Sequence, residues 1–197
     1  MNIQIETTNY CNLKCVECPH RLMKRPNRHM TTKLFQRILD TFVATLNPGT
    51  VILHKDGEPL LHPRLGEMIE KVCAVSGAKI DIYTNGLLLK PEFVQWLGKF
   101  KNKFSILISY HFYNHDGKEN DYASANPVIL ECIKSAPGNV NFVLATHQTS
   151  LASSDKLAKW KREWLLKNKD LPRLQAIHVN THINPWTGLI SEPGCVT

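Results

Sequence analysis

The sequence lacks long apolar segments and any secretory pattern. No apolar run approaches the roughly 18–20 residues that a membrane-spanning helix needs. The first residues, Met-Asn-Ile-Gln-Ile-Glu, contain neither the basic nor the apolar stretch of a signal peptide. Low-complexity tracts and solenoid-type repeats are absent as well. We therefore expect a cytoplasmic protein that has no contact with a membrane.

Length and composition are those of one globular domain. The 197 residues suffice for a substantial core, and 43% hydrophobic and 21% charged residues are ordinary values. The 24 Lys and Arg residues exceed the 17 Asp and Glu residues, which gives a formal net charge of +7. The excess lies at Arg21, Lys24, Arg25 and Arg28 and in residues 156–169. Such a surface can meet nucleic acid or an acidic partner, although a solvated helix face is the simpler explanation.

Three of the six cysteines lie within eight residues of each other. Cys11, Cys15 and Cys18 have the spacing C-x3-C-x2-C, directly after a strand-like segment. An odd number of clustered cysteines in a chain without a secretory pattern does not indicate a disulfide framework. Three thiolates on one short loop can bind three irons of a [4Fe–4S] cluster and leave the fourth iron open. The alternative is a zinc site completed by His20, because Cys3His is a common structural set.

Apolar patterns predict parallel β/α units. Alternating or fully apolar segments predict strands at residues 3–8, 51–53, 79–83, 104–110, 140–146 and 174–183. Apolar residues at helical spacing predict helices at residues 31–46, 64–76, 91–100, 126–135 and 154–167, and residues 21–30 are expected to be a mobile connection. Such units form either a doubly wound sheet or a barrel. The candidate functional residues follow individual strands, where β/α barrels build active sites, and this favours the barrel.

Turn sequences follow the second and third predicted strands. The first is Asp56-Gly57-Glu58-Pro59, and the second contains Asn85. A carboxylate beside a glycine turn offers acceptors for an ammonium group, and proline fixes the exit of the chain. Asn-Gly is also a common turn former, so Asn85 has a purely structural explanation as well.

Together these motifs resemble the radical S-adenosylmethionine (SAM) superfamily. The resemblance rests on the triple-cysteine loop after the first strand, the Gly-Glu-Pro turn after the second and Thr-Asn-Gly after the third. The string Gly-Glu-Pro-Leu-Leu-His-Pro is similar to the SPASM-type branch in particular. The resemblance covers residues 1–190 and implies an α/β fold, a partial (β/α)6 barrel of the TIM type. Two positions depart from the family pattern: Asp56 replaces a glycine, and Glu17 replaces an aromatic residue.

The resemblance implies an enzyme with one [4Fe–4S] cluster, held by Cys11, Cys15 and Cys18, and with SAM at the open iron. Reductive cleavage of SAM would give a 5′-deoxyadenosyl radical that abstracts hydrogen from a substrate, with a flavodoxin or ferredoxin as electron donor. The residues expected to bind the cofactor are Asp56, Gly57, Glu58, Pro59, Asn85, Ser109 and Asn180. The candidates for catalytic contacts are His111, His147 and His182. Strand alternation places His178, Asn180, His182 and Asn184 on one face, which we expect to be the barrel lumen.

The substrate class stays open at this point. The SPASM-type resemblance favours a peptide or protein side chain, the basic surface points to a nucleotide or nucleic-acid base, and a sugar-like metabolite is a third possibility. A zinc-stapled nucleic-acid-binding module and an iron–sulfur electron carrier are the alternatives from other function classes. Cys73 and Cys132 are expected in the core. Cys195 resembles the start of an auxiliary-cluster extension, so residues 191–197 are predicted to be a tail, without a second cluster.

Overall fold

The structure is a computed structural model that describes residues 2–16, 18–42, 49–147, 149, 151–168 and 170–180. In this part of the chain, six strands form one sheet in the order β1-β2-β3-β4-β5-β6, and every neighbouring pair is parallel. This sequential order excludes the doubly wound arrangement, in which the strand order reverses. The strands are β1 (Asn2–Gln4), β2 (Thr50–Ile52), β3 (Lys79–Thr84), β4 (Phe104–Tyr110), β5 (Val140–His147) and β6 (Leu174–Asn180).

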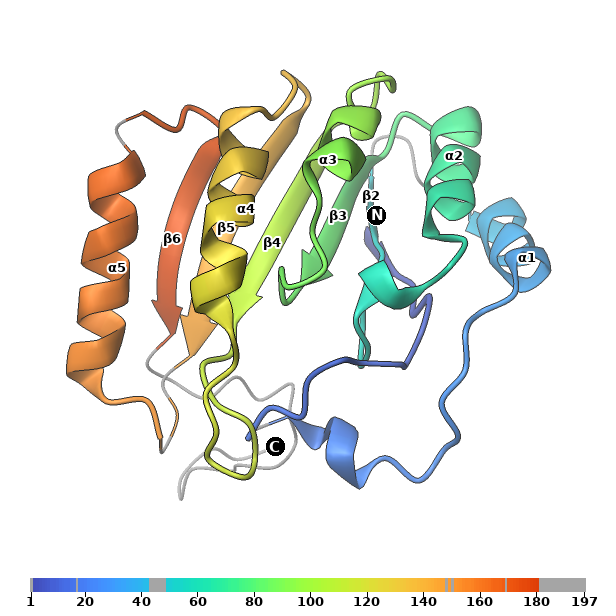
Figure 1. Cartoon of the computed structure of the whole chain (residues 1–197). Coiled ribbons are helices and arrows are strands. Elements are labelled where there is room, and N and C mark those ends of the chain that lie inside the picture. Colours follow the sequence, from blue (N-terminus) through green and yellow to red (C-terminus); the bar gives the residue numbers. More distant parts are fainter. Residues whose placement is uncertain are drawn as a thin grey trace.

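The helices cover one face of this sheet (Figure 1). A strand–helix–strand connection between parallel neighbours is right-handed, so a sequential strand order places every helix on the same side. Buried residues of each helix join a single core with alternate strand residues such as Ile82, Ile108 and Leu144. The helices are α1 (Thr32–Phe42), α2 (Leu65–Val75), α3 (Pro91–Leu97), α4 (Tyr122–Lys134) and α5 (Ser154–Asn168).

The opposite face of the sheet, here called the inner face, carries polar side chains. Paired residues of parallel strands point to the same side, so the register places Ser109, Ala145 and His178 together on the inner face. Asn180 pairs with His147 one step further along the same face. The register thus places His178 on the inner face, and the role of Asn180 in binding a cofactor stays a prediction.

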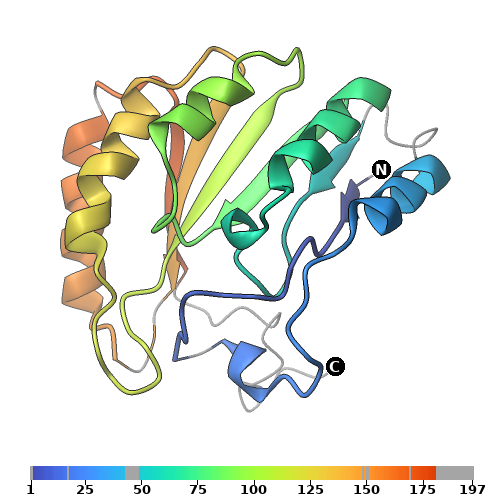
Figure 2. The same cartoon turned by 45° about the vertical axis from the view of Figure 1, so that its right-hand side comes forward.

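The carboxyl ends of the strands lie at one edge of the sheet, at the lower side of Figure 2. The cysteine loop and the connections that follow β2, β3 and β4 meet at this edge. A partial barrel thus brings together residues that are far apart in the sequence, as a β/α barrel does at its active-site end.

Two predicted boundaries were wrong by four residues. Helix α4 begins at Tyr122 rather than at residue 126, because Asp121 caps it by accepting a 3.0 Å hydrogen bond from the Ser124 N–H. Strand β1 ends at Gln4 rather than at residue 8, and the polar residues Thr7, Thr8 and Asn9 beyond it are buried. His182, Asn184, Cys195 and the predicted tail at 191–197 lie outside the described residues. Among the described helices, none combines the length and apolar character needed to span a bilayer.

Candidate cluster and cofactor site

The cysteine loop holds three reduced thiols at the strand ends. Cys15 is buried, and Cys11 and Cys18 are half-buried. Burial raises the pKa of Cys11 to about 11 and also raises those of Cys15 and Cys18, and for Cys15 the negative charges of both other thiolates add to the effect. The thiols are therefore neutral when they are alone, and they need a cationic partner to become thiolates. This donor set fits an iron–sulfur cluster, whose irons bind thiolates.

The geometry of the loop does not fit a single metal ion. In the described part of the chain, no three His, Cys, Asp or Glu side chains converge closely enough to hold one ion. The Nε2 atom of His20 lies 2.7 Å from the carbonyl oxygen of Asn9 and is already engaged there. The zinc set of Cys11, Cys15, Cys18 and His20 is therefore not assembled. A cubane cluster binds each thiolate at a separate iron, so it does not require three side chains to meet at one ion.

Gly57 allows the acidic turn to lie directly against the cysteine loop. A Cβ atom at this position would lie 2.3 Å from the carbonyl oxygen of Thr8 and 2.7 Å from that of Tyr10. Both distances are far below van der Waals contact, and the two atoms belong to the backbone, so neither can rotate away. Only glycine permits this close approach of the two chain segments.

Glu58 is the buried acid of the site, with 2% of its surface exposed. Its Oε1 atom accepts hydrogen bonds from the Thr84 hydroxyl (2.8 Å) and the Leu60 N–H (3.1 Å). Its Oε2 atom accepts one from the Asn85 N–H (2.8 Å). Burial raises its pKa to about 7, although these three donors lower it. Its negative charge also raises the pKa of Cys11, so the carboxylate lies near the cysteine loop, as the sequence motif predicts.

Asn85 and Pro59 connect the parts of the site. The side chain of Asn85 donates a 2.8 Å hydrogen bond to Asn12 Oδ1 in the cysteine loop, and its own oxygen accepts from Leu87 N–H at 3.0 Å. Pro59 is buried and opens the short 3-10 helix η3 (Pro59–Leu61). The contacts of Asn85 support its structural explanation, and the role of both residues in binding a cofactor stays a prediction.

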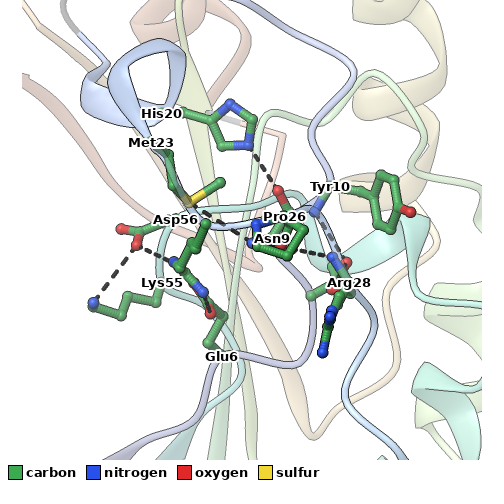
Figure 3. A network of polar contacts seen from close by, with 11 residues as sticks. Glu6, Asn9, Tyr10, His20, Met23, Pro26, Arg28, Lys55 and Asp56 are labelled. Atoms are coloured by element: carbon green, nitrogen blue, oxygen red, sulfur yellow. Dashed lines mark hydrogen bonds and ion pairs between the residues drawn. The ribbon is translucent and has the colours of Figure 1, made fainter.

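Asp56 belongs to an ion-pair network (Figure 3). The guanidinium of Arg25 lies 2.8 Å from Asp56 Oδ2 and 2.5 Å from Glu6 Oε2, and Lys55 Nζ lies 3.5 Å from the same Asp56 oxygen. Arg25 thus links the connection after the cysteines to the ends of β1 and β2. The carboxylate that replaces the family's glycine is balanced by neighbouring cations.

The connection at residues 21–30, which was predicted to be mobile, makes hydrogen bonds to the segment before the cysteines. Asn9, which is 2% exposed, donates to the Pro26 carbonyl oxygen (3.1 Å) and accepts from the Arg28 N–H (2.5 Å), as Figure 3 shows. The Met30 N–H also donates to the Thr7 carbonyl oxygen at 2.8 Å. No periodic residue pattern predicts these pairings, because they join segments of irregular backbone.

Tyr122 is a central residue of the site that the sequence analysis missed. Its hydroxyl oxygen lies 3.1 Å from the carbonyl oxygens of Asn85 and Ser109 and accepts a 3.1 Å hydrogen bond from the His111 N–H. It therefore fixes the backbone of the two predicted site residues Ser109 and His111. Tyr122 is the first residue of α4, directly after the capping residue Asp121.

Three histidines lie at this end of the inner face. The rings of His111 and His147 are nearly parallel, with centroids 6.0 Å apart, and His54 lies 5.6 Å from the ring of Tyr83. Burial lowers the pKa of His111 and of His54 to about 4, and it lowers that of His147. All three imidazoles are thus neutral at pH 7. His54, with a buried Nδ1 atom that has no hydrogen-bond partner within the described residues, was not among the predicted site residues.

Comparison with known proteins decides the family. The sequence model of the Radical SAM superfamily matches residues 5–163, which is most of the chain. The chain belongs to the Radical SAM superfamily. Radical SAM enzymes use a [4Fe–4S] cluster and SAM, so the expected enzyme class and cofactors are confirmed. The two alternative function classes, a zinc-stapled module and a simple electron carrier, are not supported.

The similar proteins share only part of their length with this radical SAM chain. The tungsten-containing aldehyde ferredoxin oxidoreductase cofactor-modifying protein of Pyrococcus furiosus is 31% identical over 97 residues, which are 49% of this chain and 27% of that protein. The antilisterial bacteriocin subtilosin biosynthesis protein AlbA of Bacillus subtilis is 26% identical over 130 residues, 62% of this chain and 28% of that protein. The chain thus spans about a quarter of these curated relatives.

A solved structure confirms the radical SAM fold. The enzyme anSMEcpe, with bound AdoMet and the Cp18Cys peptide, superimposes with a TM-score of 0.65 at 17% identity, over 98% of this chain and 53% of that one. At this identity the likeness establishes the fold alone. It confirms the predicted partial (β/α)6 barrel.

Proposed function

We propose that this chain cleaves SAM reductively at a [4Fe–4S] cluster and abstracts hydrogen from a peptide or protein side chain. One observation carries the proposal: the Gly57–Glu58 turn packs against the cysteine loop, with the carboxylate of Glu58 buried beside Cys11. Burial of a carboxylate costs more free energy than burial of a neutral side chain, so the fold alone does not explain an acid at this position. A cationic group bound at the open iron would stabilise the buried carboxylate and so explain its presence.

Cys11, Cys15 and Cys18 would hold the cluster, and their number leaves one corner for the amino and carboxylate groups of SAM. When bound, the two cofactors supply one electron and a 5′-deoxyadenosyl radical. The contribution of the protein is to position both partners and to keep water away from them. Burial of Cys15 and Glu58 supports that role.

Glu58 is the proposed acceptor for the ammonium group of SAM. A carboxylate has about four lone-pair sites, and three of these are used by Leu60, Thr84 and Asn85. The site that remains is on Oε2, the atom with a single donor. An ammonium group placed there would pair with a buried carboxylate and lower its pKa below the value of about 7 that burial imposes.

A peptide substrate is supported by the relatives and by the inner face. AlbA is a bacteriocin biosynthesis protein, and anSMEcpe is seen with a bound peptide. On this chain, Ser109 and the neutral imidazoles of His54, His111 and His147 share the inner face near the cysteine loop. Uncharged groups that both donate and accept suit peptide amides, which also do both.

The electron would come from an acidic donor protein that docks beside the cysteine loop. Arg21, Lys24 and Arg28 follow that loop and are exposed, and no ion pair engages them in the described part of the chain. A cationic surface next to the cluster speeds the encounter with flavodoxins or ferredoxins of acidic surface.

The test is anaerobic reconstitution with iron and sulfide, followed by incubation with SAM and dithionite. We expect a brown protein with one [4Fe–4S] cluster that releases 5′-deoxyadenosine. Cys15→Ala should lose both cluster and product, whereas Cys73→Ala should retain both, because Cys73 lies in α2 away from the loop. A colourless wild-type protein, or a brown one that never cleaves SAM, would rule the proposal out.

The peptide assignment needs a second measurement. A pool of short synthetic peptides that covers all side chains is incubated with the reconstituted protein and SAM and then analysed by mass spectrometry. We expect 5′-deoxyadenosine release to rise and one peptide class to lose two hydrogens or form a new bond. Equal stimulation by a pool of nucleotides, with no change in any peptide, would replace the peptide with the nucleotide as substrate.

A further inference from the structure

The loop between β4 and α4 lies directly against the cysteine loop. Residues 111–121, here called the clamp loop, run beside the cysteine loop at the lower edge of Figure 2. Cys15 and Asn114 form an antiparallel bridge, and the His115 N–H donates a 2.8 Å hydrogen bond to the Lys14 carbonyl oxygen. The other contacts of this short ribbon are Lys14 N–H to Asn114 Oδ1 at 3.4 Å and Val16 N–H to the Tyr113 carbonyl oxygen at 3.4 Å.

The clamp loop is itself folded as a small hairpin. Tyr113 and Glu119 form an antiparallel bridge, and the Asn114 N–H donates to the Lys118 carbonyl oxygen at 2.8 Å. Gly117 makes the reversal with a φ of +79°, a region that glycine enters without steric cost. The loop can therefore act as a unit whose position fixes the position of Cys15.

One side chain from a distant helix holds this hairpin. The ammonium of Lys156, in the first turn of α5, lies 2.6 Å from Glu119 Oε1 and 2.9 Å from the Tyr113 hydroxyl. It also lies 4.4 Å from the centre of the Tyr113 ring. A lone surface ion pair contributes little, but one ammonium that meets a carboxylate, a hydroxyl and an aromatic ring of one hairpin is a more specific contact. Lys156 is accordingly only 29% exposed.

We propose that Lys156 is a positioning residue for the cluster. It holds the clamp loop, and the clamp loop holds Cys15 in the geometry that cluster binding needs. The role in cluster binding rests on the proposed function. The chain of contacts from Lys156 to Cys15, in contrast, exists in the protein without cofactors. Groups that orient metal ligands commonly change metal affinity by about 10- to 100-fold when they are removed.

The first experiment measures the link without a cluster. Residue-resolved hydrogen exchange is recorded on the apo-protein for wild type, Lys156→Met and the control Lys161→Met, whose side chain is exposed on the same helix. We expect about tenfold faster exchange of the Asn114 and His115 amides in Lys156→Met, and wild-type rates in Lys161→Met. Unchanged exchange at these amides in Lys156→Met would overturn the proposal. Glu119→Gln, which leaves Lys156 in place, provides the same test if Lys156→Met does not fold.

The second experiment separates positioning from general stability. After reconstitution, iron loss to a chelator and the EPR spectrum of the reduced cluster are compared among the proteins. Each protein is measured at the same number of degrees below the thermal midpoint of its apo-form, so that differences in overall stability do not contribute. We expect at least tenfold faster iron loss and an altered spectrum in Lys156→Met, with recovery in Lys156→Arg. Wild-type iron loss and spectrum would refute the role of Lys156. Absence of a cluster in the wild type would refute the proposed function and leave the exchange result standing.

Discussion

The backbone N–H of Glu58 donates a 2.7 Å hydrogen bond to the carbonyl oxygen of Tyr10, the residue before Cys11. This bond joins two motifs that are almost fifty residues apart in the sequence and places the acid of one beside the thiols of the other. The partial barrel makes the meeting possible because β1 and β2 are neighbours with the same direction.

Gly57→Ala should separate the two motifs. The new Cβ atom would overlap the backbone of Thr8 and Tyr10, so we expect a loss of roughly 1–3 kcal/mol in the free energy of unfolding and poor cluster retention. Chemical denaturation and iron content measure the two effects. In the control Gly66→Ala, the Cβ atom meets only the Trp96 ring at 3.6 Å, and the helical position should gain stability. Wild-type cluster content in Gly57→Ala would contradict the close-approach argument.

Glu58→Gln should remove a pH dependence of stability. The folded pKa of Glu58 is raised from 4.5 to about 7, so its folded form binds the proton more tightly than its unfolded form. The stabilisation that this gives is complete below pH 4.5 and is lost as the pH rises through 7, about 3 kcal/mol in all. His54 and His111 act in the opposite direction below pH 6.5, so the quantity to measure is the difference between wild type and variant.

That difference is obtained from urea unfolding of the apo-proteins between pH 4.5 and 8. The contributions of the histidines are common to both proteins, so they cancel in the difference between the two free energies of unfolding. We expect wild type to lose stability relative to Glu58→Gln as the pH rises. A constant difference would mean that Glu58 ionises as freely in the folded chain as in the unfolded one.

Tyr122→Phe should loosen the ends of β3 and β4. Removal of the hydroxyl leaves the His111 N–H without its acceptor and removes the donor to the Asn85 and Ser109 carbonyl oxygens. We expect a cost of roughly 1–3 kcal/mol and weaker binding of SAM. Thermal unfolding and equilibrium dialysis with SAM are the measurements. Tyr83→Phe is the control, because the described residues offer no hydrogen bond to the Tyr83 hydroxyl, and it should behave as wild type.

Charge reversal beside the cysteine loop should slow electron delivery by a protein. Arg21→Glu with Lys24→Glu places two carboxylates where the proposed donor docks, and we expect about tenfold slower cluster reduction by reduced flavodoxin at low salt. The rate with dithionite, which needs no docking surface, should stay the same. The matched double variant of Lys159 and Lys161 on α5 should reduce normally. An equal loss of rate in both double variants would indicate a general charge effect.

Much of the fold was predictable because its strands are buried on both sides or alternate clearly. The prediction for Phe104–Tyr110 agrees with β4 residue for residue, and the prediction for β3 differs by one residue. The meeting of Cys11 with Glu58 was predictable too, since parallel strands deliver their carboxyl ends to one edge.

The residues that were missed share a physical reason. Asn9, Tyr122 and Lys156 act through hydrogen bonds to partners chosen by three-dimensional proximity, and such bonds leave no period in the sequence. Asp121 carried a local signal, as an acid before a helical segment, but the proline at position 127 drew the predicted start of α4 too far along the chain.

The strand order has a topological consequence for the substrate. Within the residues that the structure describes, β1 is bonded to β2 and β6 to β5, and no hydrogen bonds join β1 to β6. A ligand can approach the inner face of an open barrel from the side, and not only along the barrel axis. For the peptide substrate proposed above, a residue in the middle of the peptide can then reach the described part of the inner face from the side, without threading a terminus.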